Sequence, residues 1–277
     1  MSKIIELLNS TVTTIFDVLL YPTSVIASLW GLLLISILSG IILLLVYGKV
    51  SNQAGIKSTK RRIYSYVLES VLFRHDLNLS LKAQGNMFLA GFKYFVLAVP
   101  PILIMMIPCL LILAQLNLRY SSQPLKNGDS SIVSLTLDSD QKLFETSLIA
   151  PEGISVTPPL RDLDNNSINW RLNITNPPRE SKEIQINIGS ETVSKPLILE
   201  QNSTKIPSKT FSDWWWSFLY PGDSIARSMQ GMVKEIAISY PERSYNIFGI
   251  KMHWLVVFII ISLLSGIVGS KIFKVEI

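Results

Sequence analysis

The sequence predicts an α-helical membrane protein with three transmembrane helices, a cytoplasmic helical hairpin and an extracytoplasmic β-sandwich-like domain. Three observations favour this fold class. The chain contains three long apolar runs, each longer than the roughly 20 residues needed to cross a bilayer. A strongly basic segment separates the first two runs. After the second run, short stretches of alternating polar and apolar residues are typical of β-strands.

The charge pattern sets the predicted orientation. Residues 18–48 and 94–118 carry no charge, whereas residues 49–93 hold eight Lys and Arg residues against two acidic ones. A basic loop between two spans is typical of a cytoplasmic loop. We therefore expect a multi-pass chain with its N-terminus outside and its C-terminus inside.

This orientation assigns every segment of the chain to the membrane or to one side of it. The predicted segments are an interfacial amphipathic helix at 1–24, a first span at 25–48, a basic cytoplasmic helical hairpin at 49–92, a second span at 93–117, an extracytoplasmic β-rich domain at 118–250, a third span at 251–271 and a cytoplasmic tail at 272–277. In residues 1–24, apolar residues recur at helical spacing among polar ones, which favours a helix in the headgroup plane over a disordered leader.

Small and polar residues within the spans allow two interpretations. Ser36 and Gly40 form a small-xxx-small pair, and similar pairs occur in the third span, so these faces are suited to close helix packing. The alternative is a polar groove open to lipid. Its candidate residues are Ser36, Ser39, Gln115, Ser262 and Ser265.

The hairpin combines apolar residues at helical spacing with a basic face. Asp76 is a predicted N-cap for a helix that begins near Leu77 and continues into the second span. The candidate cytoplasmic contact residues are Lys57, Lys60, Arg61, Arg62, Arg74 and Lys82. Membrane lipid headgroups, an acidic substrate and ribosomal RNA are alternative ligands, and a merely solvated face is equally compatible. In the second span, Pro100, Pro101 and Pro108 predict a kinked or locally opened helix.

The region after Arg119 predicts a small β-sandwich. Alternating runs occur at residues 131–137, 168–174, 183–188, 193–199, 235–240 and 245–250, separated by clusters of Pro, Gly, Asn and Ser. Trp170 is a predicted core residue. Trp214, Trp215 and Trp216 form an aromatic cluster that we interpret as an anchor on the outer membrane surface, with burial inside the domain as the alternative.

The sequence offers no catalytic, metal-binding or cofactor-binding constellation. His75 and His253 are expected on opposite sides of the membrane, and the single cysteine, Cys109, lies within the second apolar run. We find no phosphate-binding glycine loop and no paired-cysteine spacing. The basic excess lies beside the membrane, which does not favour DNA as a partner. An enzyme is therefore not predicted.

Several short motifs resemble those of a bacterial family of three-span membrane proteins of uncharacterised function. They are Ser51-Asn52-Gln53, Leu72-Phe73-Arg74-His75-Asp76-Leu77, Leu81-Lys82-Ala83-Gln84, Ala114-Gln115-Leu116-Asn117-Leu118-Arg119-Tyr120 and His253-Trp254. The layout is also distantly similar to the YidC/Oxa insertase superfamily, especially its three-span Get-pathway and ER-membrane-complex branch. The large domain follows the second span, however, and the first span lacks the groove arginine of bacterial YidC.

This resemblance implies an insertase-like chaperone in the bacterial inner membrane, with membrane-protein substrates or a membrane complex as partners. The competing hypothesis is a membrane-anchored scaffold or binding subunit whose extracytoplasmic β-domain docks a partner.

Overall fold

The structure is a computed structural model that describes residues 2–20, 28–139, 142–176, 183–199, 205–222, 231–247 and 249–276. The side chains of residues 2–6, 8, 28 and 214 lie outside this description. The chain divides into two compact units. The first comprises Met1–Leu32 and Leu111–Val256, and the second comprises Leu33–Leu110 and Val257–Ile277.

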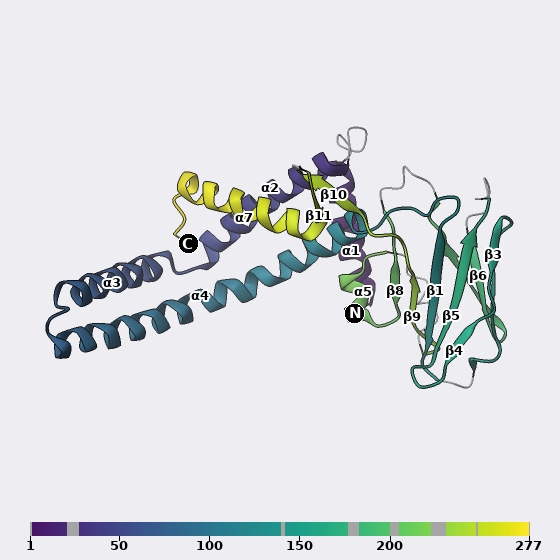
Figure 1. The fold of residues 1–277 in the computed structure, drawn as a ribbon, viewed down its shortest axis with the longest axis horizontal. Helices are drawn as coiled ribbons and strands as arrows, with labels where there is room; N and C mark the ends of the chain where they lie inside the picture. Colours follow the sequence, from purple (N-terminus) through teal and green to yellow (C-terminus); the bar gives the residue numbers. More distant parts are fainter. Residues whose placement is uncertain are drawn as a thin grey trace. The chain divides into compact units, whose positions relative to one another are not determined.

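Long helices dominate the second unit and provide the apolar segments of the chain (Figure 1). The described helices of the two units are α1 (Ser2–Leu20), α2 (Ser28–Val50), α3 (Gln53–Leu72), α4 (Leu77–Tyr120), α5 (Trp214–Leu219) and α7 (Trp254–Phe273). In the described part of the chain, α2, α4 and α7 are long and apolar enough to cross a membrane. The predicted combination of three apolar helices with a β-rich region is confirmed.

Helix α3 and the first half of α4 form a helical hairpin, and Figure 1 shows its two arms running side by side. The side chain of Asn52 caps α3 by accepting a hydrogen bond from the Gly55 N–H at 2.9 Å. Asp76 Oδ1 accepts from the N–H groups of Asn78 and Leu79 at 3.0 and 3.1 Å, which confirms the predicted N-cap. Helix α4 then runs without interruption through Pro100, Pro101 and Pro108.

The β-rich domain belongs to the first unit and consists of antiparallel strands. Its strands are β1 (Ser130–Leu137), β2 (Thr146–Ile149), β3 (Ile154–Val156), β4 (Leu160–Asp162), β5 (Ser167–Ile174), β6 (Glu183–Ile188), β7 (Glu191–Pro196), β8 (Lys209–Phe211), β9 (Val233–Ile238), β10 (Ser244–Ile247) and β11 (Ile250–His253). The larger sheet has the order β3-β5-β1-β9-β8, with β4 also paired to β5, and a smaller sheet has the order β2-β6-β7.

The two sheets share one hydrophobic core, as in a sandwich. Buried side chains of β1, β5 and β9 in the larger sheet cluster with those of β6 and β7 in the smaller one. Trp170 is among them, which confirms its predicted place in the core. The fully buried Lys195 on β7 links the sheets, because its Nζ donates to Thr210 Oγ1 at 2.7 Å and to the Ile236 carbonyl at 3.2 Å.

Each predicted alternating run overlaps a strand, although the last run differs in detail. Residues 245–247 form most of β10, and Ile250 is the first residue of β11. The two strands pair with each other as an antiparallel hairpin. Gly249 in this turn has a φ of +84°, a conformation that favours glycine. Strand β11 extends to His253, so α7 begins at Trp254, three residues later than the predicted third span.

Candidate functional site

The structure places four of the predicted groove residues at the crossing of α2 and α7. Ser36 and Ser39 on α2 are buried, at 0% and 4% exposure. On α7, Ser265 Oγ donates to the Ile37 carbonyl at 3.3 Å and to the Ser262 carbonyl at 2.9 Å. The Ser262 hydroxyl donates to the carbonyl one turn earlier on its own helix. The Ser262 and Ser265 hydroxyls are therefore engaged at or beside a helix contact, and Ser36 and Ser39 are buried.

Gly40 explains why small residues occur at this crossing. A Cβ atom on Gly40 would lie 2.0 Å from Ser265 Oγ and 2.3 Å from the Ser262 carbonyl oxygen. The second contact is with backbone, which cannot move as a flexible side chain can. The two helices approach so closely that only glycine fits, as in small-residue packing of helices in membranes. The geometry favours the packing interpretation of the serines over the groove interpretation.

Gln115, the fifth predicted groove residue, belongs to the first unit and takes part in a different polar cluster. Its Nε2 donates to Thr13 Oγ1 on α1 at 2.9 Å. Its side-chain oxygen accepts a hydrogen bond from Arg119 Nη1. Arg119 Nη2 also forms an ion pair with Asp17 Oδ1 at 2.7 Å. We refer to Thr13, Asp17, Gln115, Arg119 and Lys205 together as the α1 clamp.

The α1 clamp fastens α1 to the end of α4 and to the segment before β8. Asp17 uses both carboxylate oxygens, because Oδ2 accepts from Lys205 Nζ at 2.5 Å while Oδ1 binds Arg119. The Arg119 side chain is only 4% exposed and its guanidinium lies 5.6 Å from the centroid of the Phe16 ring, within cation–π range. Two turns before Asp17 on α1, Asn9 Nδ2 donates to the Ser217 carbonyl at 3.1 Å.

Electrostatics in the α1 clamp favour an ionised Asp17. Partial burial alone would raise the pKa of the Asp17 carboxyl, but hydrogen bonds from Lys205 and Arg119, together with their positive charges, lower it below its ordinary value. The carboxylate therefore stays charged at neutral pH and holds two cations. Removal of Asp17 would leave the buried guanidinium of Arg119 without its carboxylate, whereas removal of Arg119 would leave a partly exposed carboxylate that still pairs with Lys205.

The basic residues of the hairpin divide into two groups. Lys57 and Lys60 form ion pairs with Glu276 in the C-terminal tail, at 3.3 and 3.8 Å. The Glu276 N–H also donates to Gln53 Oε1 at 2.7 Å, so the tail is held at the start of α3. The other predicted contact residues, Arg61, Arg62, Arg74 and Lys82, are exposed.

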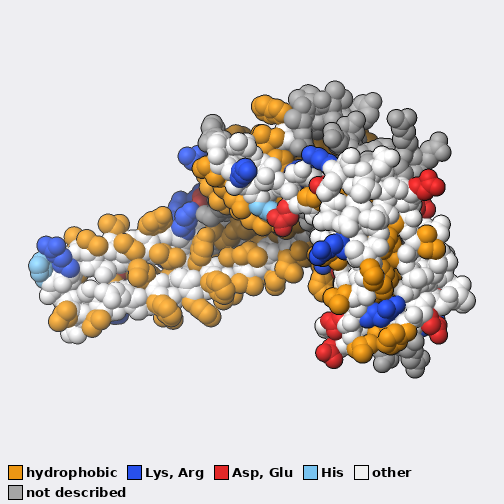
Figure 2. All heavy atoms as spheres, turned by 45° about the vertical axis from the view of Figure 1, so that its right-hand side comes forward, with side chains coloured by type: hydrophobic (Ala, Val, Ile, Leu, Met, Phe, Trp, Pro, Cys, Tyr) orange, Lys and Arg blue, Asp and Glu red, His pale blue; other side chains and the backbone are white. Residues whose placement is uncertain are grey.

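Large apolar side chains are exposed along both arms of the hairpin. Figure 2 shows hydrophobic side chains on each arm, with basic side chains and a histidine at the tip. The most exposed apolar side chains are between 64% and 76% accessible and comprise Leu68, Val71, Leu72, Leu77, Leu81, Phe88 and Leu89. Exposed apolar side chains in this number favour contact with another protein segment or with membrane.

The predicted tryptophan anchor is partly described. Trp215 and Trp216 on α5 are each 46% exposed, so each ring is half covered. Trp216 packs on Phe211 with 5.6 Å between ring centroids, and Trp215 stacks on Phe218 at 6.3 Å. The side chain of Trp214 lies outside the described residues. Both rings therefore make contacts within the domain and stay partly exposed, and the interpretation of the cluster as an anchor on the outer membrane surface stays a prediction.

The described residues contain no group of three or more His, Cys, Asp or Glu side chains that could hold a metal ion. His75 lies in the turn between α3 and α4, and His253 ends β11. No family model, curated protein or solved structure matches the chain.

Proposed function

We propose that this chain is a multi-pass protein of the bacterial inner membrane that assists the insertion or assembly of other membrane proteins, as an insertase-like chaperone. In this proposal α2, α4 and α7 cross the bilayer, the α3–α4 hairpin lies in the cytoplasm, and the β-domain and N-terminus lie outside. The length and apolar composition of the three helices and the basic charge of the hairpin support this arrangement.

One observation carries the functional part of the proposal, namely the exposed apolar surface on both arms of the hairpin. A hairpin that only oriented the protein would need basic residues but no exposed leucine or phenylalanine. An incoming apolar segment would cover these side chains, and covering each one is worth about 1.5–3 kcal/mol before the cost of association is subtracted. The affinity for an apolar segment is then modest, which suits transient handover.

The exposed cations have a second role in this mechanism. Each Lys or Arg near an anionic leaflet contributes about 1 kcal/mol of attraction. Arg61, Arg62 and Lys82 would therefore hold the hairpin close to the cytoplasmic membrane surface. A segment that binds the apolar arms is thereby presented beside the bilayer. The two serine hydroxyls on α7 bond to backbone carbonyls and the two serines on α2 are buried, so this mechanism assigns the holding of substrate to the hairpin and not to a serine groove.

Site-specific photocrosslinking tests this proposal. A photoreactive amino acid replaces Phe88 or Leu68 in the full chain, and ribosome-bound nascent chains with an apolar segment are added to membranes that contain it. The matched control position is Gln84, which is exposed on the same arm as Phe88 but is polar. We expect crosslinks from positions 88 and 68 that require the apolar segment. Equal crosslinking at position 84, or none at all three positions, would refute the proposal.

A second candidate function is a scaffold whose β-domain docks a partner. Exposed apolar side chains on that domain favour it, since Phe144 and Leu160 are each 71% exposed. The same photoreactive amino acid at Phe144 or Leu160 separates the two functions. Reproducible capture of one discrete partner from these positions, with no capture of nascent chains from the hairpin, would favour the scaffold.

A further inference from the structure

Helix α1 directs its polar side inward, toward the protein. Its inward-facing residues follow one helical stripe and contact the rest of the first unit: Asn9 binds Ser217, Thr13 binds Gln115, and Asp17 binds Arg119 and Lys205. A helix on the surface of a water-soluble domain has the opposite arrangement, with its apolar stripe inward and its polar side in solvent.

The outward side of α1 is mainly apolar. Leu7, Ile15 and Val18 lie on this side and are between 56% and 71% exposed. They recur with the helical period, so they form a stripe along one face. Charged groups that could hydrate this face are absent from the described side chains of α1, because its charged residue with a described side chain, Asp17, is paired inward.

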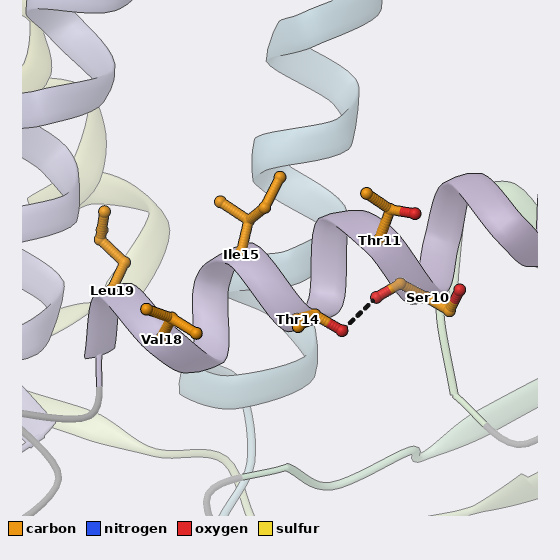
Figure 3. Close-up of a pocket in the computed structure, with 6 residues that line it drawn as sticks. All are labelled: Ser10, Thr11, Thr14, Ile15, Val18 and Leu19. Carbon is orange, nitrogen blue, oxygen red and sulfur yellow. Dashed lines mark hydrogen bonds between the residues drawn. The ribbon is translucent and has the colours of Figure 1, made fainter.

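The hydroxyl groups on the outward side need no water. Thr11 and Ser10 each donate to the Leu7 carbonyl, at 2.6 and 3.0 Å, and Thr14 donates to the Ser10 carbonyl at 2.8 Å. Figure 3 shows the bond between Thr14 and Ser10 and the neighbouring apolar side chains along α1. Hydroxyls that bond to the preceding turn of their own helix leave no donor that must be hydrated.

A shallow hollow of about 500 Å³ follows this face and is lined by Ser10, Thr11, Thr14, Ile15, Val18 and Leu19 (Figure 3). Its lining offers methyl and methylene groups and hydroxyls that are already bonded.

The level at which α1 lies relative to the proposed bilayer follows from its attachment to α4. Gln115 and Arg119 lie in the last turns of α4, where the charge-free run of residues 94–118 ends. Helix α1 is therefore attached beside the end of an apolar helix that is long enough to span a bilayer. At that level an apolar face with satisfied hydroxyls matches acyl chains, and the inward ion pairs keep the charges of the α1 clamp away from lipid.

We propose that the outward face of α1 is a lipid-contact surface on which acyl chains of the outer leaflet lie against Leu7, Ile15 and Val18. The α1 clamp makes this possible by satisfying the polar side of the helix within the protein. The inference rests on the membrane placement in the proposed function and on no part of the insertase mechanism.

Quenching of a fluorophore from two sides tests this surface in the reconstituted full chain. In a Cys109→Ser background, an environment-sensitive fluorophore is attached at Val18→Cys or Leu7→Cys. The matched controls are Ile104→Cys on α4, which is exposed in the apolar run, and Asp164→Cys, which is exposed on the β-domain. Nitroxide-labelled phospholipid in the vesicles quenches from the acyl region, and iodide quenches from water.

We expect the labels at positions 18 and 7 to emit at shorter wavelength than the label at position 164, with strong nitroxide and weak iodide quenching. Iodide quenching at position 18 equal to that at position 164, with position 104 still quenched by lipid, would overturn the α1 inference alone. Protection from both quenchers, with disulfide-linked dimers of Val18→Cys, would show a second copy on this face and also overturn it. Weak nitroxide quenching at position 104 would overturn the membrane placement itself.

Discussion

Replacement of Arg119 by alanine should release α1 from the first unit. Arg119 provides the central cation of the α1 clamp and is almost completely buried, whereas its partner Asp17 is 42% exposed at the side chain. Removing one partner of a fully buried pair costs about 3–5 kcal/mol, and an exposed pair is worth about 0–1 kcal/mol. Asp17 also keeps Lys205 in the variant. We therefore expect an intermediate loss of about 2–3 kcal/mol.

This loss should appear in the local opening of α1. At about 1.4 kcal/mol per tenfold change, the equilibrium for detachment of α1 should shift roughly 30- to 150-fold. Hydrogen–deuterium exchange of the purified full chain measures this shift directly as faster exchange of the α1 amides. The β1 amides should keep their protection, because the sandwich core does not include Arg119.

The matched control is Arg171→Ala, since Arg171 is exposed on β5 and a substitution there should change stability by less than about 0.5 kcal/mol. Unchanged α1 exchange in Arg119→Ala would refute the assignment of Arg119 to the α1 clamp. An equal loss of protection in α1 and β1 would show that the variant unfolds the whole unit.

The remaining predictions concern pH, helix crossing and the sandwich core. The pKa of Asp17 is lowered in the fold, so its contribution to holding α1 is present above about pH 4 and is lost as the pH falls through that lowered pKa. Acid should therefore release α1 in the wild type, as followed by fluorescence of a label on α1. In Asp17→Asn, acid should cause no additional release. Gly40→Ala should destabilise the α2–α7 crossing by about 1–3 kcal/mol in thermal unfolding, whereas Gly85→Ala, where the added methyl group meets nothing within 4 Å, should be neutral or stabilising. Lys195→Ala should destabilise the sandwich by about 1–3 kcal/mol, because it removes the two buried hydrogen bonds to Thr210 and Ile236. Exchange of the β9 amides measures this loss, and the exposed control Lys126→Ala should have little effect.

Distinct results would contradict each of these expectations. An acid transition of equal size in wild type and Asp17→Asn would remove Asp17 as its cause. Equal melting of the two glycine variants would mean that α2 and α7 do not meet at Gly40. A Lys195→Ala variant with wild-type exchange in β9 would show that the buried ammonium group contributes nothing to joining the sheets.

Much of the fold follows from local sequence patterns. The three apolar helices could be predicted because hydropathy over 20 residues is a property of a continuous segment. The longer strands could be predicted because alternation over six to eight residues exceeds chance, as in β1 and β5. The strands β2, β3, β4 and β8 have only three or four residues, which is too short for alternation to register.

The candidate site depended on contacts that local patterns do not contain. Asp17 and Arg119 are separated by 102 positions, and no spacing rule pairs them. A signal was nevertheless present, because Asp17 is the last charge before the first apolar run and Arg119 is the first charge after the second. Opposite charges that border two charge-free runs are suited to pair where the spans end. Likewise, the choice between packing and groove for Ser36 depended on the approach of α7, which the sequence of α2 alone does not specify.

The central claim is that the hairpin and the β-domain lie on opposite sides of a membrane. In the Cys109→Ser background, a membrane-impermeant thiol reagent should label Asp164→Cys on the β-domain in spheroplasts, where the outer face of the inner membrane is open to the reagent. It should label Gln84→Cys on the hairpin only after the membrane is broken. Labelling of both positions in intact spheroplasts, or of neither before lysis, would contradict the topology on which the proposed function depends.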